Sequence, residues 1–399
     1  MKLLLYSHFF APSVGGVETI VLSLARGLAE LRTKDSQPQF ALTVVTETPA
    51  ANFDDRSLPF RVTRQPRLRE LWRIIRASDV IHIAGPSLAP LFLAKLARKP
   101  VVVEHHGYQA ICPNGVLLQQ PAATICPGHF QAGHYGKCLR CQSVEMPLTQ
   151  SLANLLKMFP RNVLTRASAR NIAISRHVLE RHALPRSTVL YYGIEKAREP
   201  EVLPATQPPS LAPRPEKMCF AYIGRLVPEK GLLVLLAAAE ILQREDFAFE
   251  LLLIGDGPER PRLEAVITRA NLTTAVHITG FLQGAAFAEK LNAVRVVVMP
   301  SVWEETAGLA AIEQMMRGRL VIASKIGGLG EVVGNAGLLR EPGNAEDLAR
   351  CMKEVLQDPS IVTALGRVAR ERAQSLFLRE RMIADHAGLY AELSRRSRS

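Results

Sequence analysis

Short apolar runs alternate along this chain with longer segments of helical periodicity. Because these runs are apolar throughout and do not alternate with polar residues, they predict strands buried on both faces, as in parallel sheets. In the first half the predicted strands are Lys2 to Tyr6, Phe40 to Thr46, Val80 to Ala84, Pro100 to Glu104 and Asn171 to Ile174. In the second half they are Met218 to Ile223, Phe249 to Ile254, Val276 to Thr279, Val294 to Met299 and Leu320 to Ala323.

The segments between these runs predict amphipathic helices. After Val17, apolar residues recur at helical spacing, at Ile20, Val21, Leu24, Leu28 and Leu31. Strands that alternate with helices in this way predict α/β architecture, here two doubly wound domains that face each other. Ligands of such sheets bind at the carboxyl ends of the strands, so we expect a site in the cleft between the domains.

A proline-rich stretch separates the two halves. Residues 200–215 contain six prolines and few large apolar side chains, which indicates an interdomain linker. We therefore expect a first domain over 1–199 and a second over 216–378, followed by a terminal segment over 379–399.

Two glycine-containing turns each lead from a predicted strand into a helix. Gly15 and Gly16 would let backbone amides approach an anion, although a strand-to-helix turn alone can require such glycines. In the second half, GRLVPEKG places Arg225 at a strand end and Lys230 at a helix N-terminus. These two cations and the helix dipole could hold a diphosphate, the alternative being two ordinary surface cations.

A pair of glutamates follows the strand that ends at Met299. Glu305 lies in the loop and Glu313 eight residues later on the next helix, so both could reach one ligand. The amides of Ala307, Gly308 and Leu309 could donate to sugar hydroxyls or phosphate at this helix N-terminus. The alternative is a pair of acids that only cap an ordinary helix.

Together with GGVE and GDGPE, these motifs resemble the family 4 retaining glycosyltransferases of the GT-B fold, in family order over nearly the whole chain. The resemblance implies that the second domain binds a nucleotide sugar. It places Arg225 and Lys230 on the diphosphate, Glu313 on the ribose, and Glu305 with the following amides on the donor sugar. It also implies that Gly15 and Gly16 close on the phosphates, and that a final helix near residues 382–393 returns to the first domain.

The resemblance assigns a histidine near the donor sugar to His106, for which the adjacent His105 could be mistaken. Two positions depart from the family pattern: Ala307 replaces a usual aromatic residue, and Tyr192 stands before Gly193 where asparagine is usual. These departures leave the donor sugar open. Since the chain has no D-x-D pair, we expect the leaving diphosphate to be stabilised by cations of the chain, with no cofactor needed for catalysis.

Four cysteines lie together within a glycine- and proline-rich insertion over residues 105–145. Cys112, Cys126, Cys138 and Cys141 are compatible with a tetrahedral structural zinc, and His129 or His134 could replace one ligand. Buried reduced thiols and disulfides are the alternatives.

The net charge of +12 lies entirely in the first half, where residues 1–199 carry 25 Lys and Arg against 13 Asp and Glu. This predicts an anionic partner, unless the charge only makes that face soluble. Leu68, Leu71, Trp72 and Ile75 form one helical face, which we expect to pack as core. The surrounding arginines would then contact an anionic membrane: Arg64, Arg67, Arg69, Arg73 and Arg76.

No run is long enough for a transmembrane helix or a signal-peptide core, so we expect a cytoplasmic protein at the inner face of the plasma membrane. The function expected is transfer of a sugar from a UDP- or GDP-sugar to an acceptor hydroxyl, in cell-surface polysaccharide or glycolipid synthesis. A nucleotide-sugar epimerase is the alternative enzyme. The alternative from another class is a nucleic-acid-binding protein, which the lack of a helix-turn-helix signature disfavours.

Overall fold

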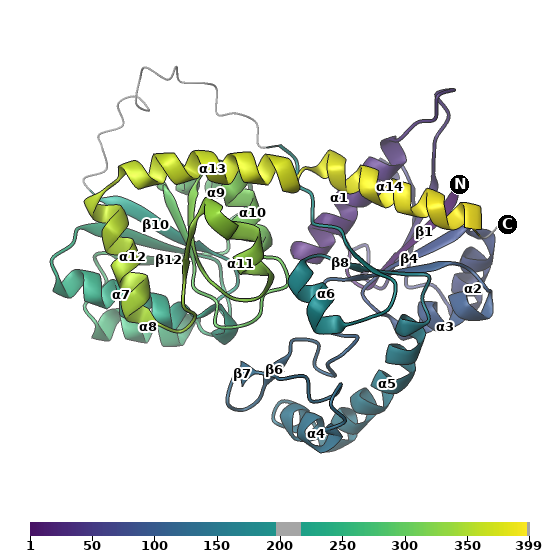
Figure 1. The fold of residues 1–399 in the computed structure, drawn as a ribbon, viewed down its shortest axis with the longest axis horizontal. Helices are drawn as coiled ribbons and strands as arrows, with labels where there is room; N and C mark the ends of the chain where they lie inside the picture. Colours follow the sequence, from purple (N-terminus) through teal and green to yellow (C-terminus); the bar gives the residue numbers. More distant parts are fainter. Residues whose placement is uncertain (197–216, 397–399) are drawn as a thin grey trace. The chain divides into compact units, whose positions relative to one another are not determined.

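The computed structural model describes residues 1–196 and 217–396, so the predicted linker over 200–215 lies outside the described residues. The chain divides into two compact units. Unit 1 consists of Met1–Glu195 and Phe377–Ser399, and unit 2 of Lys196–Leu376. Each unit contains its own parallel sheet with helices packed against it (Figure 1).

Unit 1 contains a seven-stranded parallel sheet of order β3-β2-β1-β4-β5-β8-β9. Its strands are β1 (Lys2–Ser7), β2 (Ala41–Thr46), β3 (Arg61–Arg64), β4 (Val80–Ala84), β5 (Val101–His105), β8 (Arg170–Ala173) and β9 (Ser187–Val189). A separate antiparallel pair is formed by β6 (Leu118–Gln119) and β7 (Thr124–Ile125).

The helices of unit 1 pack against its sheet and against one another. Its helices are α1 (Gly16–Glu30), α2 (Leu68–Ala77), α3 (Leu88–Leu96), α4 (Tyr135–Ser143), α5 (Leu148–Arg166), α6 (Arg176–His182) and α14 (Arg379–Arg396), with a short 3-10 turn η1 (Asp55–Ser57). The C-terminal helix α14 packs against α1 and β4. On α2 and α3, Leu71, Ile75 and Leu91 pack against β1, β4 and β5 through alternate strand residues such as Leu4 and Ile81.

Unit 2 contains a six-stranded parallel sheet of order β12-β11-β10-β13-β14-β15. Its strands are β10 (Met218–Ile223), β11 (Phe249–Ile254), β12 (Val276–Gly280), β13 (Val296–Met299), β14 (Leu320–Ser324) and β15 (Leu338–Arg340). Its helices are α7 (Leu232–Arg244), α8 (Arg260–Arg269), α9 (Gly284–Ala293), α10 (Leu309–Met316), α11 (Gly327–Val333), α12 (Ala345–Gln357) and α13 (Ser360–Leu376), with 3-10 turns η2 (Pro228–Lys230) and η3 (Gly334–Ala336).

The two parallel sheets confirm the predicted α/β class, and all ten predicted strands are present with ends shifted by at most two residues. Three strands of the parallel sheets were missed: β3, β9 and β15. Each lies at the edge of its sheet, is only three or four residues long, and has little or no fully buried surface. Edge strands are not enclosed on both faces, so they lack the continuous apolar run on which the prediction depended.

The predicted apolar face of Leu68, Leu71, Trp72 and Ile75 is only partly correct. Leu71 and Ile75 are buried in the core, but Leu68 is 65% exposed. Arg64 does not belong to that helix, because it ends strand β3.

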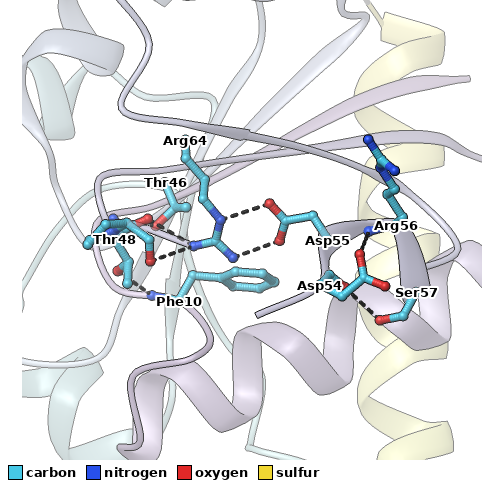
Figure 2. Close-up of polar contacts among 9 residues, drawn as sticks. Phe10, Thr46, Thr48, Asp54, Asp55, Arg56, Ser57 and Arg64 are labelled. Carbon is cyan, nitrogen blue, oxygen red and sulfur yellow. Dashed lines mark hydrogen bonds and ion pairs between the residues drawn. The ribbon is translucent and has the colours of Figure 1, made fainter. Parts of the chain in front are cut away.

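The guanidinium of Arg64 is held inside unit 1 and is not a free surface cation (Figure 2). Its Nε and Nη2 donate to the two carboxylate oxygens of Asp55 at 2.8 and 2.7 Å. Its Nη1 donates to the carbonyl oxygen of Thr48 at 2.8 Å, and its charge lies 5.9 Å from the ring centroid of Phe10. Arg64 therefore ties the loop after β2 to β3, and its assignment as a membrane contact is wrong.

Candidate active site

In unit 2 the loops after β10 and β13 touch, because Gly231 in the first loop allows a very close approach to the second. Gly231, between η2 and α7, has φ of 68°, and a Cβ there would lie 2.0 Å from the carbonyl oxygen of Pro300. The Val302 amide also donates to the Glu229 carbonyl oxygen at 3.1 Å. Only glycine fits this contact, which places Lys230 beside the loop after β13.

An ion pair forms where these loops meet. Lys230 Nζ donates to Glu305 Oε1 at 2.8 Å, and the two side chains are 17 and 7% exposed. The Ser301 hydroxyl donates to the same carboxylate oxygen. Lys230 Nζ also lies 5.7 Å from the ring centroid of Trp303. The structure thus brings together two of the predicted site residues and adds Ser301, which the sequence did not single out.

Arg225 lies in the same loop but has a different environment. Its side chain is 77% exposed, and its nearest acid is Glu229, at 3.8 Å. The Tyr222 hydroxyl donates to the Arg225 carbonyl oxygen at 2.7 Å, which fixes the backbone while the guanidinium extends into solvent. Burial, followed by the charge of Glu305, raises the pKa of Tyr222, so this hydroxyl stays a donor.

The N-terminus of α10 is adjacent in sequence to Glu305. Gly308 caps this helix with φ of 77°, and Ala307 is buried. Among hydrogen bonds between described residues, the amides of Ala307, Gly308 and Leu309 donate none. Unused amides at a helix N-terminus can bind an anion.

Glu313 lies on the second turn of α10 and is half-buried. Burial raises the pKa of Glu313, an effect that Arg317 partly offsets. The Glu313 side chain has no ion pair with another described residue. A carboxyl group in this position can accept hydrogen bonds from ligand hydroxyls.

In unit 1, Gly15 caps α1 and Gly16 begins it. A Cβ on Gly15 would lie 2.4 Å from Glu18 Oε2, so the glycine accommodates this carboxylate at the start of the helix. The Glu18 carboxylate therefore lies beside the amides that the sequence assigned to a phosphate.

His105 and His106 point into different parts of unit 1. His105 Nε2 lies 3.0 Å from Asn171 Oδ1, and its ring contacts that of His182 at 4.6 Å between centroids. Burial, followed by the charge of His182, lowers the pKa of His105 to about 3, so it is neutral at pH 7. His106 instead belongs to a buried cluster around Glu104.

The carboxylate of Glu104, at the end of β5, is surrounded by three imidazoles. Its Oε2 lies 3.1 Å from His82 Nε2 and 3.7 Å from both His106 Nε2 and His386 Nε2. Burial alone would raise the pKa of Glu104, but the charge of His106 and the hydrogen bonds of His386 and His82 hold it well below its usual range. The group is therefore an ionised carboxylate in the core of unit 1.

The outer nitrogens of these three rings have different partners. His82 Nδ1 and His106 Nδ1 lie 2.5 and 2.8 Å from the hydroxyls of Tyr390 and Tyr192. Burial raises the pKa of both tyrosines, so each can donate to its imidazole. His386 Nδ1 instead donates to the carbonyl oxygen of Met382 at 2.8 Å. The C-terminal helix thus places a third imidazole beside the Glu104 carboxylate.

Three residues of this cluster were not among the predicted site residues: Glu104, His82 and His386. A glutamate within the apolar run VVVEH was the available signal, since an ionisable residue in a buried strand requires a partner. Its partner His386 is 282 positions away in the sequence, and no local pattern identifies it.

The four cysteines of the insertion line one small cavity together with His129 and Gln142. All four are free thiols, and burial raises the pKa of Cys138 to about 12. No three of these cysteine sulfurs lie within 4.8 Å of one another. Among the described residues, the donor atoms of His82, Glu104 and His386 do lie this close together. A metal ion would therefore have to draw these sulfurs closer together.

Comparison with known structures identifies the fold as that of the GT-B glycosyltransferases. HepE from Anabaena, solved in complex with UDP, matches with a TM-score of 0.71 and 18% identity over 98% of this chain and 100% of that one. Sucrose-phosphate synthase from Thermosynechococcus elongatus matches with a TM-score of 0.69 and 22% identity over 98% of each chain.

Residues 217–358, which include Arg225, Lys230, Glu305 and Glu313, match the family Glycosyl transferases group 1. The 2-deoxystreptamine glucosyltransferase of Streptomyces kanamyceticus is 40% identical over 154 residues, or 38% of this chain and 40% of that protein. A 2-deoxystreptamine N-acetyl-D-glucosaminyltransferase of Streptomyces fradiae is 27% identical over 87% of this chain and 83% of its own length. The match to the first relative thus spans less than half of that relative's length. Unit 2 carries a Glycosyl transferases group 1 domain.

Replacing His386 should destabilise the protein more than replacing an exposed residue of the same helix. His386→Leu removes one of the three imidazoles that face the buried Glu104 carboxylate, and breaking a buried contact of a charged group typically costs about 3 to 5 kcal/mol. Glu392→Gln removes the partly exposed ion pair with Arg170 and should cost about 1 kcal/mol or less. Urea unfolding of both variants measures these costs, and equal costs would refute the role of His386 in holding Glu104.

Proposed function

We propose that this protein is a retaining glycosyltransferase of family 4, which transfers a sugar from a UDP- or GDP-sugar to an acceptor hydroxyl. The observation that carries the proposal is the Lys230–Glu305 ion pair beside the unused amides of the α10 N-terminus. A cation, a carboxylate and free amides at the carboxyl ends of parallel strands suit a diphosphate joined to a sugar.

In the proposed donor complex, each group faces one part of the nucleotide sugar. Lys230 and Arg225 bind the diphosphate, and Glu313 accepts hydrogen bonds from the ribose hydroxyls. Glu305 binds the donor sugar together with the amides of Ala307, Gly308 and Leu309. Gly15, Gly16 and His106 are the contributions of unit 1, the glycines to the phosphates and His106 to the sugar.

The proposed reaction replaces one bond at the anomeric carbon on the same face of the sugar. The bond from this carbon to the phosphate oxygen breaks, and its electrons leave with the nucleoside diphosphate. The acceptor oxygen forms the new bond, and its proton passes to the departing phosphate oxygen. Lys230 and Arg225 stabilise the negative charge that develops on this leaving group, and no further cofactor is required for the chemistry.

The acceptor is proposed to be membrane-associated, as in the synthesis of cell-surface polysaccharides or glycolipids at the inner face of the plasma membrane. The charge of +12, which residues 1–199 account for, supports an anionic surface as the partner of unit 1. No helix among the described residues has the length and apolar character to cross a bilayer. The proposed association is therefore peripheral.

A structural zinc held by Cys112, Cys126, Cys138 and Cys141 is also part of the proposal. The shared cavity and the thiol donor set support it, since zinc prefers four sulfur or nitrogen ligands. Binding would require the thiols to release their protons. The ion would fix the insertion that connects β5 to α5.

Removing either cation of the site should slow sugar transfer. Lys230→Ala and Arg225→Ala should each lower turnover with a nucleotide sugar by about 100-fold or more, because each removes a charge aimed at the leaving group. Arg244→Ala, at an exposed cation of the same unit, is the control and should retain turnover. If the folded Lys230 and Arg225 variants both keep near-wild-type turnover, the diphosphate assignment is wrong.

Glu313 should contribute to nucleotide affinity. Glu313→Ala removes the ribose contact and should weaken UDP or GDP binding by about tenfold, the cost of about one charged hydrogen bond. Isothermal titration with each nucleotide measures the change, with Glu264→Ala on α8 as an exposed control. Unchanged affinity in the Glu313 variant would remove the ribose role.

Purified protein should contain about one zinc per chain. Elemental analysis should find that Cys138→Ser/Cys141→Ser loses this zinc and that Cys219→Ala, at a buried cysteine of unit 2, retains it. Absence of zinc from carefully prepared wild-type protein would contradict the site. Zinc that is lost from His386→Leu but kept by Cys138→Ser/Cys141→Ser would also contradict the site.

A further inference from the structure

One face of α5 is apolar and exposed. Leu148, Leu152, Leu156, Phe159 and Val163 are between 39 and 64% exposed. At 3.6 residues per turn these side chains fall within an arc of about 80° and extend along about 22 Å of helix. We call these five residues the α5 stripe. A contiguous exposed apolar surface of this kind marks an interaction site.

The α5 stripe is distinct from the face by which the helix packs on unit 1. Leu155 and Met158 are buried against Phe130 and Cys138 of the insertion. Ser151 and Thr165 are buried on the same side. The packed face already holds the helix in place, and the α5 stripe stays exposed, although the ring of Phe159 contacts those of Phe130 and Tyr135.

Neighbouring helices add further exposed apolar side chains. On α3, which packs against α5, Phe92 and Leu96 are 56 and 61% exposed. Tyr135 of α4 contacts Phe159, with ring centroids 5.1 Å apart. The stripe residues Phe159 and Val163 also line a groove, together with Phe130, Tyr135 and Arg166. Aromatic side chains of this kind suit the boundary between headgroups and acyl chains.

The segment that carries this surface is strongly basic. Residues 88–166 carry eight cations, Lys95, Arg98, Lys99, Lys137, Arg140, Lys157, Arg161 and Arg166. The same segment contains two acids, of which Glu104 is buried and only Glu145 is exposed. An apolar helix face among cations has the composition of an interfacial helix on anionic lipid.

We propose that the α5 stripe inserts into the surface of an anionic lipid bilayer and that the surrounding cations bind the headgroups. This inference names the surface for the membrane association in the proposed function and rests on that function for its biological purpose. A second copy of the chain fits less well, because a symmetric interface would bring two basic surfaces together. On α2 the corresponding apolar residues Leu71 and Ile75 are already buried in the core.

Vesicle sedimentation with the full chain tests this proposal. Wild-type protein is spun with phosphatidylcholine vesicles and with vesicles containing 30% phosphatidylglycerol, each at low and high salt. Leu152→Glu/Leu156→Glu/Val163→Glu is compared with Leu68→Glu, which places the same charge at an exposed leucine of α2. Single Leu156→Glu serves as a milder variant, and thermal unfolding confirms that each variant is folded.

Wild type and Leu68→Glu should bind the anionic vesicles at low salt. The triple variant should partition at least tenfold less, and Leu156→Glu should fall between them. Binding by the triple variant equal to wild type would overturn the proposal. A wild-type dimer that ignores vesicles and becomes monomeric in the triple variant would also overturn it, in favour of self-association.

Calorimetric binding of UDP and GDP to the same proteins separates this inference from the proposed function. The triple variant should bind nucleotide as wild type does, because its substitutions lie in unit 1 away from Lys230. Vesicle binding by a wild-type protein that binds no nucleotide would support the docking surface and refute the glycosyltransferase. Nucleotide binding without vesicle binding would support the glycosyltransferase and refute the docking surface.

Discussion

The ion pair between Lys230 and Glu305 is the interaction on which the candidate site depends. It joins the loops that follow β10 and β13, and it forms because Gly231 allows one loop to approach the carbonyl of Pro300. Lys230 has three donors, and Glu305 Oε1 already accepts from Lys230 and from Ser301. The Lys230 side chain is 17% exposed, so its ammonium can also donate to a ligand, which favours a role in binding an anion.

Unit 1 is organised around the buried carboxylate of Glu104. Strand β5 supplies this charge, β4 supplies His82, and the C-terminal helix supplies His386 and Tyr390. The same carboxylate orients His106, the one residue of this cluster that we assign to the donor sugar. The helix that follows unit 2 is thus tied through His386 to Glu104, in the strand that precedes His106. The C-terminal helix is therefore held on unit 1 by polar contacts as well as by apolar packing.

The sequence predicted those parts of the molecule that follow from local patterns. Buried strands such as β10 and β11 are continuous apolar runs, and the Lys230 loop is bounded by glycines at positions where backbones touch. It could not predict the partner of Glu104, since His386 lies on a distant helix. It also misassigned Arg64, because the Asp55 that pairs with it is on a neighbouring loop with no motif of its own. Periodicity likewise did not distinguish α2, whose Leu71 and Ile75 are covered, from α5, whose stripe is not.

The proposed donor site has a nucleoside diphosphate in unit 2 beside Lys230 and the N-terminus of α10. A crystal structure of the protein soaked with UDP-glucose or with a GDP-sugar is the direct test. Diphosphate oxygens are expected within hydrogen-bond distance of Lys230 Nζ and of an amide among Ala307, Gly308 and Leu309, with the ribose at Glu313. A nucleotide bound elsewhere, with the Lys230–Glu305 contact unchanged and these amides unused, would contradict it.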